Sequence, residues 1–230
     1  MTIGVMDSGI GGLGVLAELV KRKCAENYVY FSDGENLPYG NKTKNELREI
    51  ALRGVKILRE RGANVLVFGC NTLSSAALDA ARNAFVGPTF GLLPRPEFCL
   101  GKSLLLTTPT TALFLPKLSE NLSLLTPPDL AALIDGDYPD LTNVEAYLSP
   151  LLAPYADAES VYLGCSHYVF ARSVFRKALP KAKILSGINA LADLVKAVLP
   201  AANVKSQNVD FLFSGKNQTD RYAAILSSLL

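Results

Sequence analysis

The sequence Val65-Leu66-Val67-Phe68-Gly69-Cys70-Asn71-Thr72 decides the fold, because an apolar run of strand length ends in a glycine and a thiol before a helix-like stretch. A similar phrase, Val161-Tyr162-Leu163-Gly164-Cys165-Ser166-His167, follows later in the chain. Each phrase predicts a buried strand that ends where a helix begins, so each cysteine meets the backbone N–H groups and the positive pole of that helix. Both features favour the thiolate. The repetition therefore predicts a matched pair of acid/base groups.

Outward from these two runs, short apolar segments alternate with segments of helical period along nearly the whole chain. This alternation predicts an α/β fold with mostly parallel sheets flanked by helices. Strands are expected at Thr2–Met6, Val29–Ser32, Val65–Gly69, Thr89–Leu93, Ser103–Thr107, Leu122–Leu125, Val161–Gly164, Lys183–Leu185 and Val209–Phe213. Helices are expected at Gly12–Cys24, Lys44–Arg61, Ser74–Ala84, Val144–Leu152, Tyr168–Ala178, Ala190–Val198 and Asp220–Leu229.

Two passages divide these elements into two similar α/β domains. The proline-rich stretch from Gly87 to Pro96 interrupts regular structure and stiffens the connection, and a second passage is expected near Ser186-Gly187. We expect a first α/β domain of residues 1-90 plus 187-230 and a second α/β domain of residues 91-186. The active site is expected in the interdomain cleft, because ligands of parallel sheets bind beyond the carboxyl ends of the strands.

The composition favours a small molecule as the partner. The formal net charge is only +2, with 49% hydrophobic and 19% charged residues, and no basic stripe is interleaved with aromatic residues. Nucleic acid is therefore not an expected partner. No signal-like start and no apolar run of the roughly 20 residues that span a bilayer are present, so a cytoplasmic protein without a membrane partner is expected. The four cysteines contain no CxxC pair and are expected to be free thiols; no metal site is expected.

Three polar clusters follow predicted strands at their carboxyl ends. They are Asp7-Ser8-Gly9, Cys70-Asn71-Thr72 and Cys165-Ser166-His167. Moving the α-proton of an amino acid from one face of the carbon to the other requires a base on one side and an acid on the other. A thiolate and a thiol serve this purpose without an organic cofactor. Asp7 and His167 are the candidates to manage the protons of the thiols.

Each of these residues also fits a structural role when it is considered alone. A cysteine at a strand end is most often a small buried apolar residue, and a lone histidine is more often structural than functional. Asp7 fits a helix cap about as well as a catalytic group. The recurrence of the whole phrase around Cys70 and Cys165 favours the functional interpretation.

Four motifs, taken in order, resemble the signature of the cofactor-independent aspartate/glutamate racemase family, and within it most closely the glutamate racemases. The motifs are Asp7-Ser8-Gly9-x-Gly11-Gly12-Leu13, Pro38-Tyr39-Gly40, Cys70-Asn71-Thr72 and Gly164-Cys165-Ser166-His167-Tyr168. The resemblance implies two α/β domains with the active site at their interface. It also implies interconversion of L- and D-glutamate for bacterial peptidoglycan synthesis, with a homodimer as the oligomeric state.

The resemblance assigns a role to each matched residue. Cys70 and Cys165 would be the catalytic proton-transfer residues on opposite faces of the substrate, assisted by Asp7 and His167. The carboxylates and the ammonium of the substrate would be held by residues drawn from all four motifs: Asp7, Ser8, Tyr39, Gly40, Asn71, Thr72, Ser166 and His167.

The chain departs from the family pattern at several positions, and these leave the substrate open. Ser166 stands where the family usually has threonine, and Asp135 stands where glutamate racemases carry a glutamate. The loop Thr107-Thr108-Pro109-Thr110-Thr111 replaces a Gly-Thr substrate loop. Aspartate or another amino acid is therefore an alternative substrate. A non-catalytic relative that binds an amino acid or regulates a partner is a further alternative.

Overall fold

The strands form two sheets in the computed structural model, which describes residues 1–200 and 204–230. Within these residues the strand order is β4-β3-β1-β2-β9 in the first sheet and β6-β5-β7-β8 in the second. The first sheet contains β1 (Thr2–Asp7), β2 (Asn27–Ser32), β3 (Val65–Phe68), β4 (Thr89–Gly91) and β9 (Asn208–Phe213). The second contains β5 (Ser103–Thr107), β6 (Leu122–Leu125), β7 (Ser160–Gly164) and β8 (Lys183–Leu185). Every strand pair among them is parallel, so the predicted α/β class is confirmed.

Helices flank both sheets. They are α1 (Leu13–Lys21), α2 (Lys44–Glu60), α3 (Asn71–Ala84), α4 (Pro109–Ala112), α5 (Leu130–Asp137), α6 (Thr142–Leu152), α7 (Arg172–Ala178), α8 (Ile188–Val198) and α9 (Thr219–Leu229). Short 3-10 helices are found at Gly34–Asn36, Tyr39–Asn41, Pro96–Phe98, Ala153–Tyr155 and Ser166–Ala171. Residues 201–203, inside the segment 187-230 that we expected to join the first domain, lie outside the described residues.

Several predicted helices differ from the observed ones at their ends, and two of the differences lie beside the cysteines. The helix expected at Ser74–Ala84 begins three residues earlier, at Asn71, because Cys70 is its N-cap. The single helix expected at Tyr168–Ala178 is wrong: a 3-10 helix, Ser166–Ala171, comes first, and α7 follows it. The 3-10 form closes with a bond from the N–H of Tyr168 to the carbonyl of Cys165 (3.1 Å), which is the i to i+3 pattern of the tighter helix.

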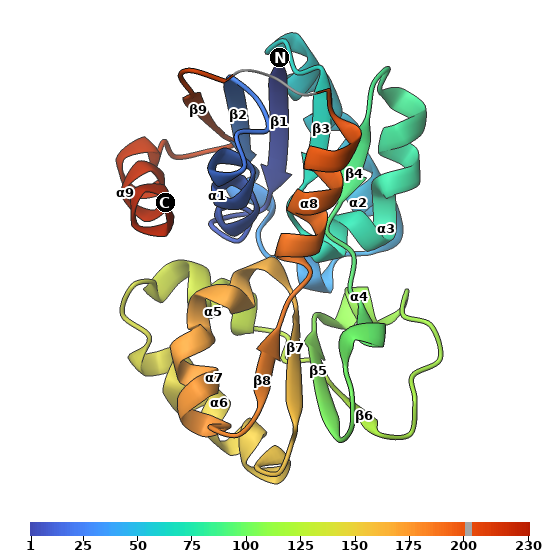
Figure 1. The fold of residues 1–230 in the computed structure, drawn as a ribbon, viewed down its shortest axis with the longest axis vertical. Helices are drawn as coiled ribbons and strands as arrows, with labels where there is room; N and C mark the ends of the chain where they lie inside the picture. The colour runs from blue at the N-terminus through green and yellow to red at the C-terminus, as the bar shows by residue number, and fades with distance from the viewer. Residues whose placement is uncertain (201–203) are drawn as a thin grey trace.

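The carboxyl ends of the two sheets face each other. In Figure 1 the arrow of β1 points down toward the second sheet and the arrow of β8 points up toward the first. The chain passes to the second sheet after β4 and returns after β8, so that β9 pairs with β2 at the edge of the first sheet. Residues that follow β1, β3, β5 and β7 are thereby gathered between the sheets.

The cores lie between each sheet and its helices. One buried cluster joins β1 and β2 to α1, α8 and α9, and continues through α5, α6 and α7 onto β7. A second cluster packs α2 and α3 on the opposite face of the first sheet. Close packing is visible at Gly54 of α2, where a Cβ atom would come within 2.1 Å of the Met6 sulfur. These cores fix the positions of the strand ends.

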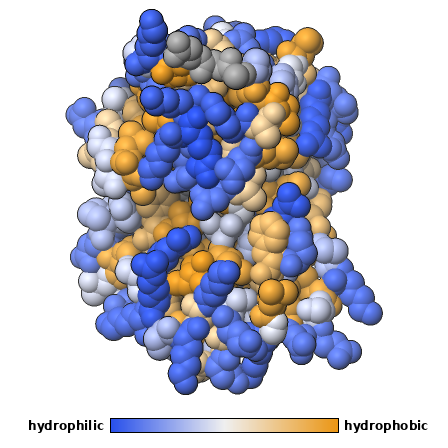
Figure 2. All heavy atoms as spheres, in the orientation of Figure 1, coloured by the Kyte–Doolittle hydropathy of each residue, from blue (hydrophilic) through white to orange (hydrophobic). Residues whose placement is uncertain are grey.

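Figure 2 shows hydrophilic residues spread over this face of the molecule, with small apolar areas in both halves. Among the residues that the structure describes, no helix combines the length and the apolar character needed to cross a membrane.

Candidate active site

Cys70 follows β3 and is the N-cap of α3. Its Sγ accepts a hydrogen bond from the N–H of Leu73 (3.5 Å), and its side chain is only 4% exposed. Burial raises the pKa of Cys70 well above its usual range, and the charges of Asp7 and Cys165 add to this increase. The helix N–H groups of Leu73 and Thr72 lower the pKa as expected, but burial outweighs them. Burial therefore favours the thiol form of Cys70 in this structure.

Cys165 follows β7 and is 3% exposed. It precedes the 3-10 helix Ser166–Ala171, and its side chain makes no capping hydrogen bond there. The hydrogen bond of the Cys165 side chain helps to raise the pKa of His167. The two cysteines thus occupy corresponding strand ends but have different local surroundings. Cys70 is bonded to its helix, whereas Cys165 interacts with an imidazole.

Asp7 is the last residue of β1, and it is hydrogen-bonded to a residue that follows β7 of the second sheet. Its Oδ2 accepts a hydrogen bond from the hydroxyl of Ser166 (2.9 Å), and its Oδ1 accepts one from the N–H of Gly9 (3.2 Å). The side chain is fully buried. Burial raises the pKa of Asp7, and the charge of His167 and these hydrogen bonds oppose the increase. Gly12, not Asp7, is the N-cap of α1, so the alternative role of Asp7 as a helix cap is not observed.

His167 is paired with Asp135 of α5. Its Nε2 lies 2.9 Å from Asp135 Oδ2, which also accepts a hydrogen bond from the N–H of Ile10 (2.7 Å). Burial lowers the pKa of His167, but the bonds from Asp135 and Cys165 and the charge of Asp7 outweigh burial and hold the pKa well above 6.5. These contacts favour the protonated form of His167, which lies beside the Asp135 carboxylate and the Cys165 side chain.

Asp135 is a site residue that the motifs did not assign. Burial opposes its ionisation, but His167, the Ile10 N–H and Arg221 together keep the pKa of Asp135 below its usual value. The only sequence signal was that Asp135 stands where the related family has a glutamate. Since α5 follows β6 at the same edge of the sheet, topology brings Asp135 to His167.

Three threonine hydroxyls form a second link between the sheets. Thr72 Oγ1 lies 2.9 Å from Thr108 Oγ1, and Thr111 donates to Thr72 Oγ1 (3.1 Å). Thr108 and Thr111 belong to the loop that replaces the expected Gly-Thr segment. Gly40 packs against this loop, where a Cβ atom would come within 2.9 Å of the Thr108 side chain. The structure thus gathers Gly40, Thr72, Thr108 and Thr111.

The other expected substrate-binding residues differ in their surroundings. The Tyr39 hydroxyl donates to Asp33 Oδ2 (2.8 Å), and the Ser8 hydroxyl donates to Asp7 Oδ1 (3.4 Å). Asn71 is 1% exposed, and its Oδ1 has no hydrogen-bond partner among the described residues. An unpaired buried acceptor costs about 1–3 kcal/mol, so this position of Asn71 is unfavourable for the fold alone.

At two positions of the loop after β1, the backbone lies too close to residues of the second sheet's half for any side chain larger than hydrogen. A Cβ atom on Gly9 would lie 1.8 Å from Asp135 Oδ2. On Gly11 it would lie 2.5 Å from Ser166 Oγ and 2.6 Å from His167 Nδ1. Glycine at these two positions is what allows the backbone to reach the Asp135–His167 pair.

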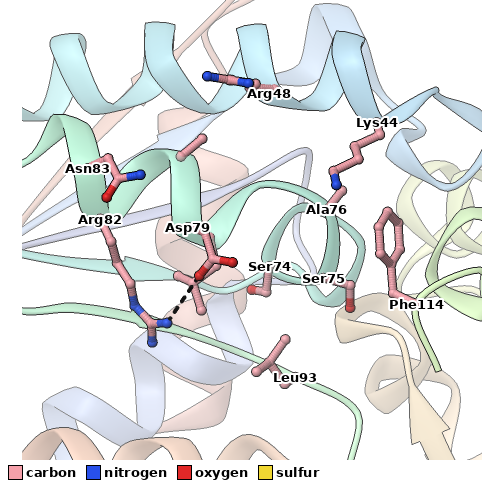
Figure 3. Close-up of a pocket in the computed structure, with 12 residues that line it drawn as sticks. Lys44, Arg48, Ser74, Ser75, Ala76, Asp79, Arg82, Asn83, Leu93 and Phe114 are labelled. Atoms are coloured by element: carbon pink, nitrogen blue, oxygen red, sulfur yellow. Dashed lines mark hydrogen bonds and ion pairs between the residues drawn. The ribbon is translucent and has the colours of Figure 1, made fainter. Parts of the chain in front are cut away.

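A separate cavity of about 490 Å³ lies between α2, α3 and Phe114. Figure 3 shows Lys44 and Arg48 on one wall, Phe114 at one end, and the Arg82–Asp79 ion pair (3.5 Å) on the other side. Neither thiol lines this cavity. In the described ranges, 1–200 and 204–230, no group of three or more histidine, cysteine, aspartate or glutamate side chains is placed to hold a metal ion.

We expect Asp135→Asn to lower the free energy of unfolding by about 3 kcal/mol near pH 6 and by less near pH 10. The raised pKa of His167 means that its pairing contributes fully below 6.5 and is lost as the pH rises through the raised value. The lowered pKa of Asp135 preserves the contribution on the acid side until the pH falls through that lower value. Urea unfolding of both proteins at the two pH values measures the effect. A loss of equal size at both would contradict it.

Curated relatives match most of the chain. The glutamate racemase of Leptospira interrogans is 36% identical over 202 residues, covering 81% of this chain and 78% of its own. That of Halothermothrix orenii is 31% identical over 250 residues, covering 100% and 99%. No protein-family model matches the chain.

Solved structures match the fold. Glutamate racemase from Campylobacter jejuni aligns with a TM-score of 0.82 at 21% identity, covering 99% of this chain and 97% of that one. The enzyme from Escherichia coli, solved with L-glutamate and an activator, also gives 0.82, at 23% identity and 99% and 94% coverage. The two facing parallel sheets of this chain are therefore the fold of these solved glutamate racemases. With relatives 31% and 36% identical over most of its length, the chain belongs to the glutamate racemase family.

Proposed function

We propose that the protein interconverts L- and D-glutamate by proton transfer between two cysteines, without an organic cofactor. The observation that carries this proposal is the placement of Cys70 and Cys165 at the carboxyl ends of β3 and β7, one from each facing sheet. Relatives support the substrate: the Francisella tularensis glutamate racemase was solved with D-glutamate and the E. coli enzyme with L-glutamate.

The proposed reaction moves one proton onto and one proton off the α-carbon. One cysteine, as a thiolate, removes the α-proton and becomes a thiol. The other thiol then donates its proton to the opposite face of the carbanion and becomes a thiolate. The same two groups work in reverse for the other enantiomer, so the net charge of the site is conserved.

Asp7 and His167 are proposed to manage the thiol protons. The charge of Asp7 acts on Cys70, and the Cys165 side chain is bonded to His167. A carboxyl group on one side and an imidazolium on the other allow one thiol to be deprotonated while the other is kept protonated. This asymmetry suits a reaction in which the two thiols exchange roles.

The polar groups around the thiols are proposed to hold the substrate. The unpaired Oδ1 of Asn71 is an acceptor for the ammonium group. Hydroxyl and backbone donors of Ser8, Tyr39-Gly40, Thr72 and Ser166 would hold the carboxylates. Thr72 is bonded to Thr108 and Ser166 donates to Asp7 in this structure, so a bound glutamate would replace bonds that are already present. Both thiols are buried, so a substrate would reach them only after groups that cover them move.

The deciding experiment is chiral chromatography of purified, reduced protein with L-glutamate and no added pyridoxal phosphate, with L-aspartate in parallel. Formation of D-glutamate is the expected result. Conversion of aspartate alone would replace the proposed substrate. No conversion of either amino acid by folded protein, together with binding of glutamate, would favour the non-catalytic alternative.

The proposed biological role is the supply of D-glutamate for peptidoglycan, by a cytoplasmic homodimer whose two domains comprise residues 1-90 plus 187-230 and 91-186. The family resemblance and the two crossings of the chain between the sheets support this view. Growth of a D-glutamate auxotroph on expression of the chain tests the role, and light scattering tests the dimer.

A further inference from the structure

Arg221, in the first turn of α9, reaches from the first sheet's side of the molecule to α5 on the second. Its Nη1 lies 3.5 Å from Asp135 Oδ1, and its Nη2 donates to the main-chain carbonyl of Asp135. Nη1 also donates to Gln218 Oε1 (2.9 Å). In Figure 1, α9 lies beside α1 and above α5, so this contact spans the two halves of the fold.

We propose that Arg221 is a positioning residue for the racemisation: it holds the Asp135 carboxylate against His167 and thereby acts on Cys165. The proposal rests on the proposed function above, but the contact on which it depends can be tested separately. None of the four sequence motifs includes Arg221.

The two oxygens of the Asp135 carboxylate have different partners. Oδ2 serves His167 and the N–H of Ile10, while Oδ1 faces Arg221. The carbonyl of Asp135 is among the last four of α5 and has no acceptor role within the helix, so the guanidinium satisfies a group that the helix leaves open. Arg221 thus holds both the backbone and the side chain of Asp135.

The first turn of α9 is packed against the first sheet, which fixes the position of Arg221. Tyr222 is 1% exposed and packs edge-on against Phe213 with ring centroids 4.9 Å apart. Its hydroxyl lies 2.8 Å from Ser32 Oγ at the end of β2. The residue next to Arg221 is therefore anchored to two strands of the first sheet.

The direction in which the pKa of His167 changes when Arg221 is removed distinguishes a positioning role of Arg221 from a purely electrostatic one. The groups that face His167 are Asp7 of β1, Asp135 of α5 and the neighbouring Cys165. If Arg221 acted only as a nearby cation, its removal would raise the pKa of His167. If it holds Asp135 in place, its removal leaves the carboxylate held by the Ile10 N–H and His167 alone, and its contact with His167 loosens. The pKa of His167 then falls, because the hydrogen bond between His167 and Asp135 is the largest influence that raises it.

The test uses the fact that the chain contains a single histidine. NMR titration of protein labelled with ¹⁵N-histidine reports His167 alone, with no need for activity. We expect the His167 pKa to fall in Arg221→Met. In Arg221→Lys we expect a value between those of the parent protein and Arg221→Met. An unchanged or higher pKa in folded Arg221→Met would overturn the proposal, even if glutamate turned out not to be the substrate.

Arg22→Met is the matched control. Arg22 is 23% exposed against 31% for Arg221, and it also joins two helices through carboxylates, Glu18 and Asp193, but it contacts no site residue. Its substitution should leave the His167 titration unchanged; an equal shift in this control would assign the effect to general loosening and overturn the proposal. With glutamate as substrate, kcat of Arg221→Met should fall about tenfold with KM nearly unchanged.

Discussion

Cys70→Ala and Cys165→Ala should each lose about a thousandfold or more of the glutamate racemase activity while keeping the fold. Each thiol serves one face of the α-carbon, and no second thiol lies on the same strand end to replace it. Both side chains are small and buried, so alanine removes little volume and the loss reports chemistry rather than unfolding. Chiral chromatography of both variants and of the parent protein measures the loss.

Solvent exchange distinguishes the two thiols. In D₂O, each variant retains at most one base, so it should incorporate deuterium at the α-carbon of at most one enantiomer, and the two variants should differ in which one. Cys99→Ala is the control, since Cys99 is only partly buried and lies in the passage between the sheets. Normal racemisation in either active-site variant would remove the basis of the proposed mechanism.

Gly9→Ala should reduce kcat/KM by about a hundredfold with little change in secondary structure. The added methyl group would lie 1.8 Å from Asp135 Oδ2, so Asp135 must move. It cannot move freely, because the same oxygen is bonded to the Ile10 N–H and to His167. The displacement therefore passes to His167, and steady-state kinetics with circular dichroism measures both the loss and the fold.

Gly136→Ala is the matched control for this prediction. Gly136 is the neighbour of Asp135 within α5, and a Cβ atom there meets nothing within 4 Å. Alanine should leave activity unchanged and raise the stability by up to about 1 kcal/mol, because glycine is costly inside a helix. Activity of Gly9→Ala equal to that of Gly136→Ala would show that the close approach of the loop does not matter.

The strands were predictable from the sequence, whereas two helices were not. Apolar runs with abrupt ends identify β3 and β7 without ambiguity. In contrast, α4 has only four residues and α5 has eight, with Gly136 near its end, so neither presents a helical period long enough to recognise. The early start of α3 was missed because cysteine is not a usual N-cap.

The motifs identified residues that follow the strands, but not the partners that topology brings to them. Asp7 is the last residue of its strand, and Cys70, Cys165 and His167 follow theirs within a few residues, so their shared edge could be inferred. Asp135 and Arg221 lie on helices far apart in the chain, and only the closed fold brings them together. The pKa of Cys70 also depends on burial between the sheets, which no local pattern encodes.

The pairing of β9 with β2 has a consequence for the order in which the protein is made. Since β9 and α9 follow the whole second sheet in the chain, a ribosome releases that sheet before the strand that finishes the first one. Until β9 emerges, β2 is an open edge able to pair with another nascent chain. Translation thus delivers Arg221 to Asp135 only after the whole second sheet has been made, and the edge of β2 stays unpaired during that interval.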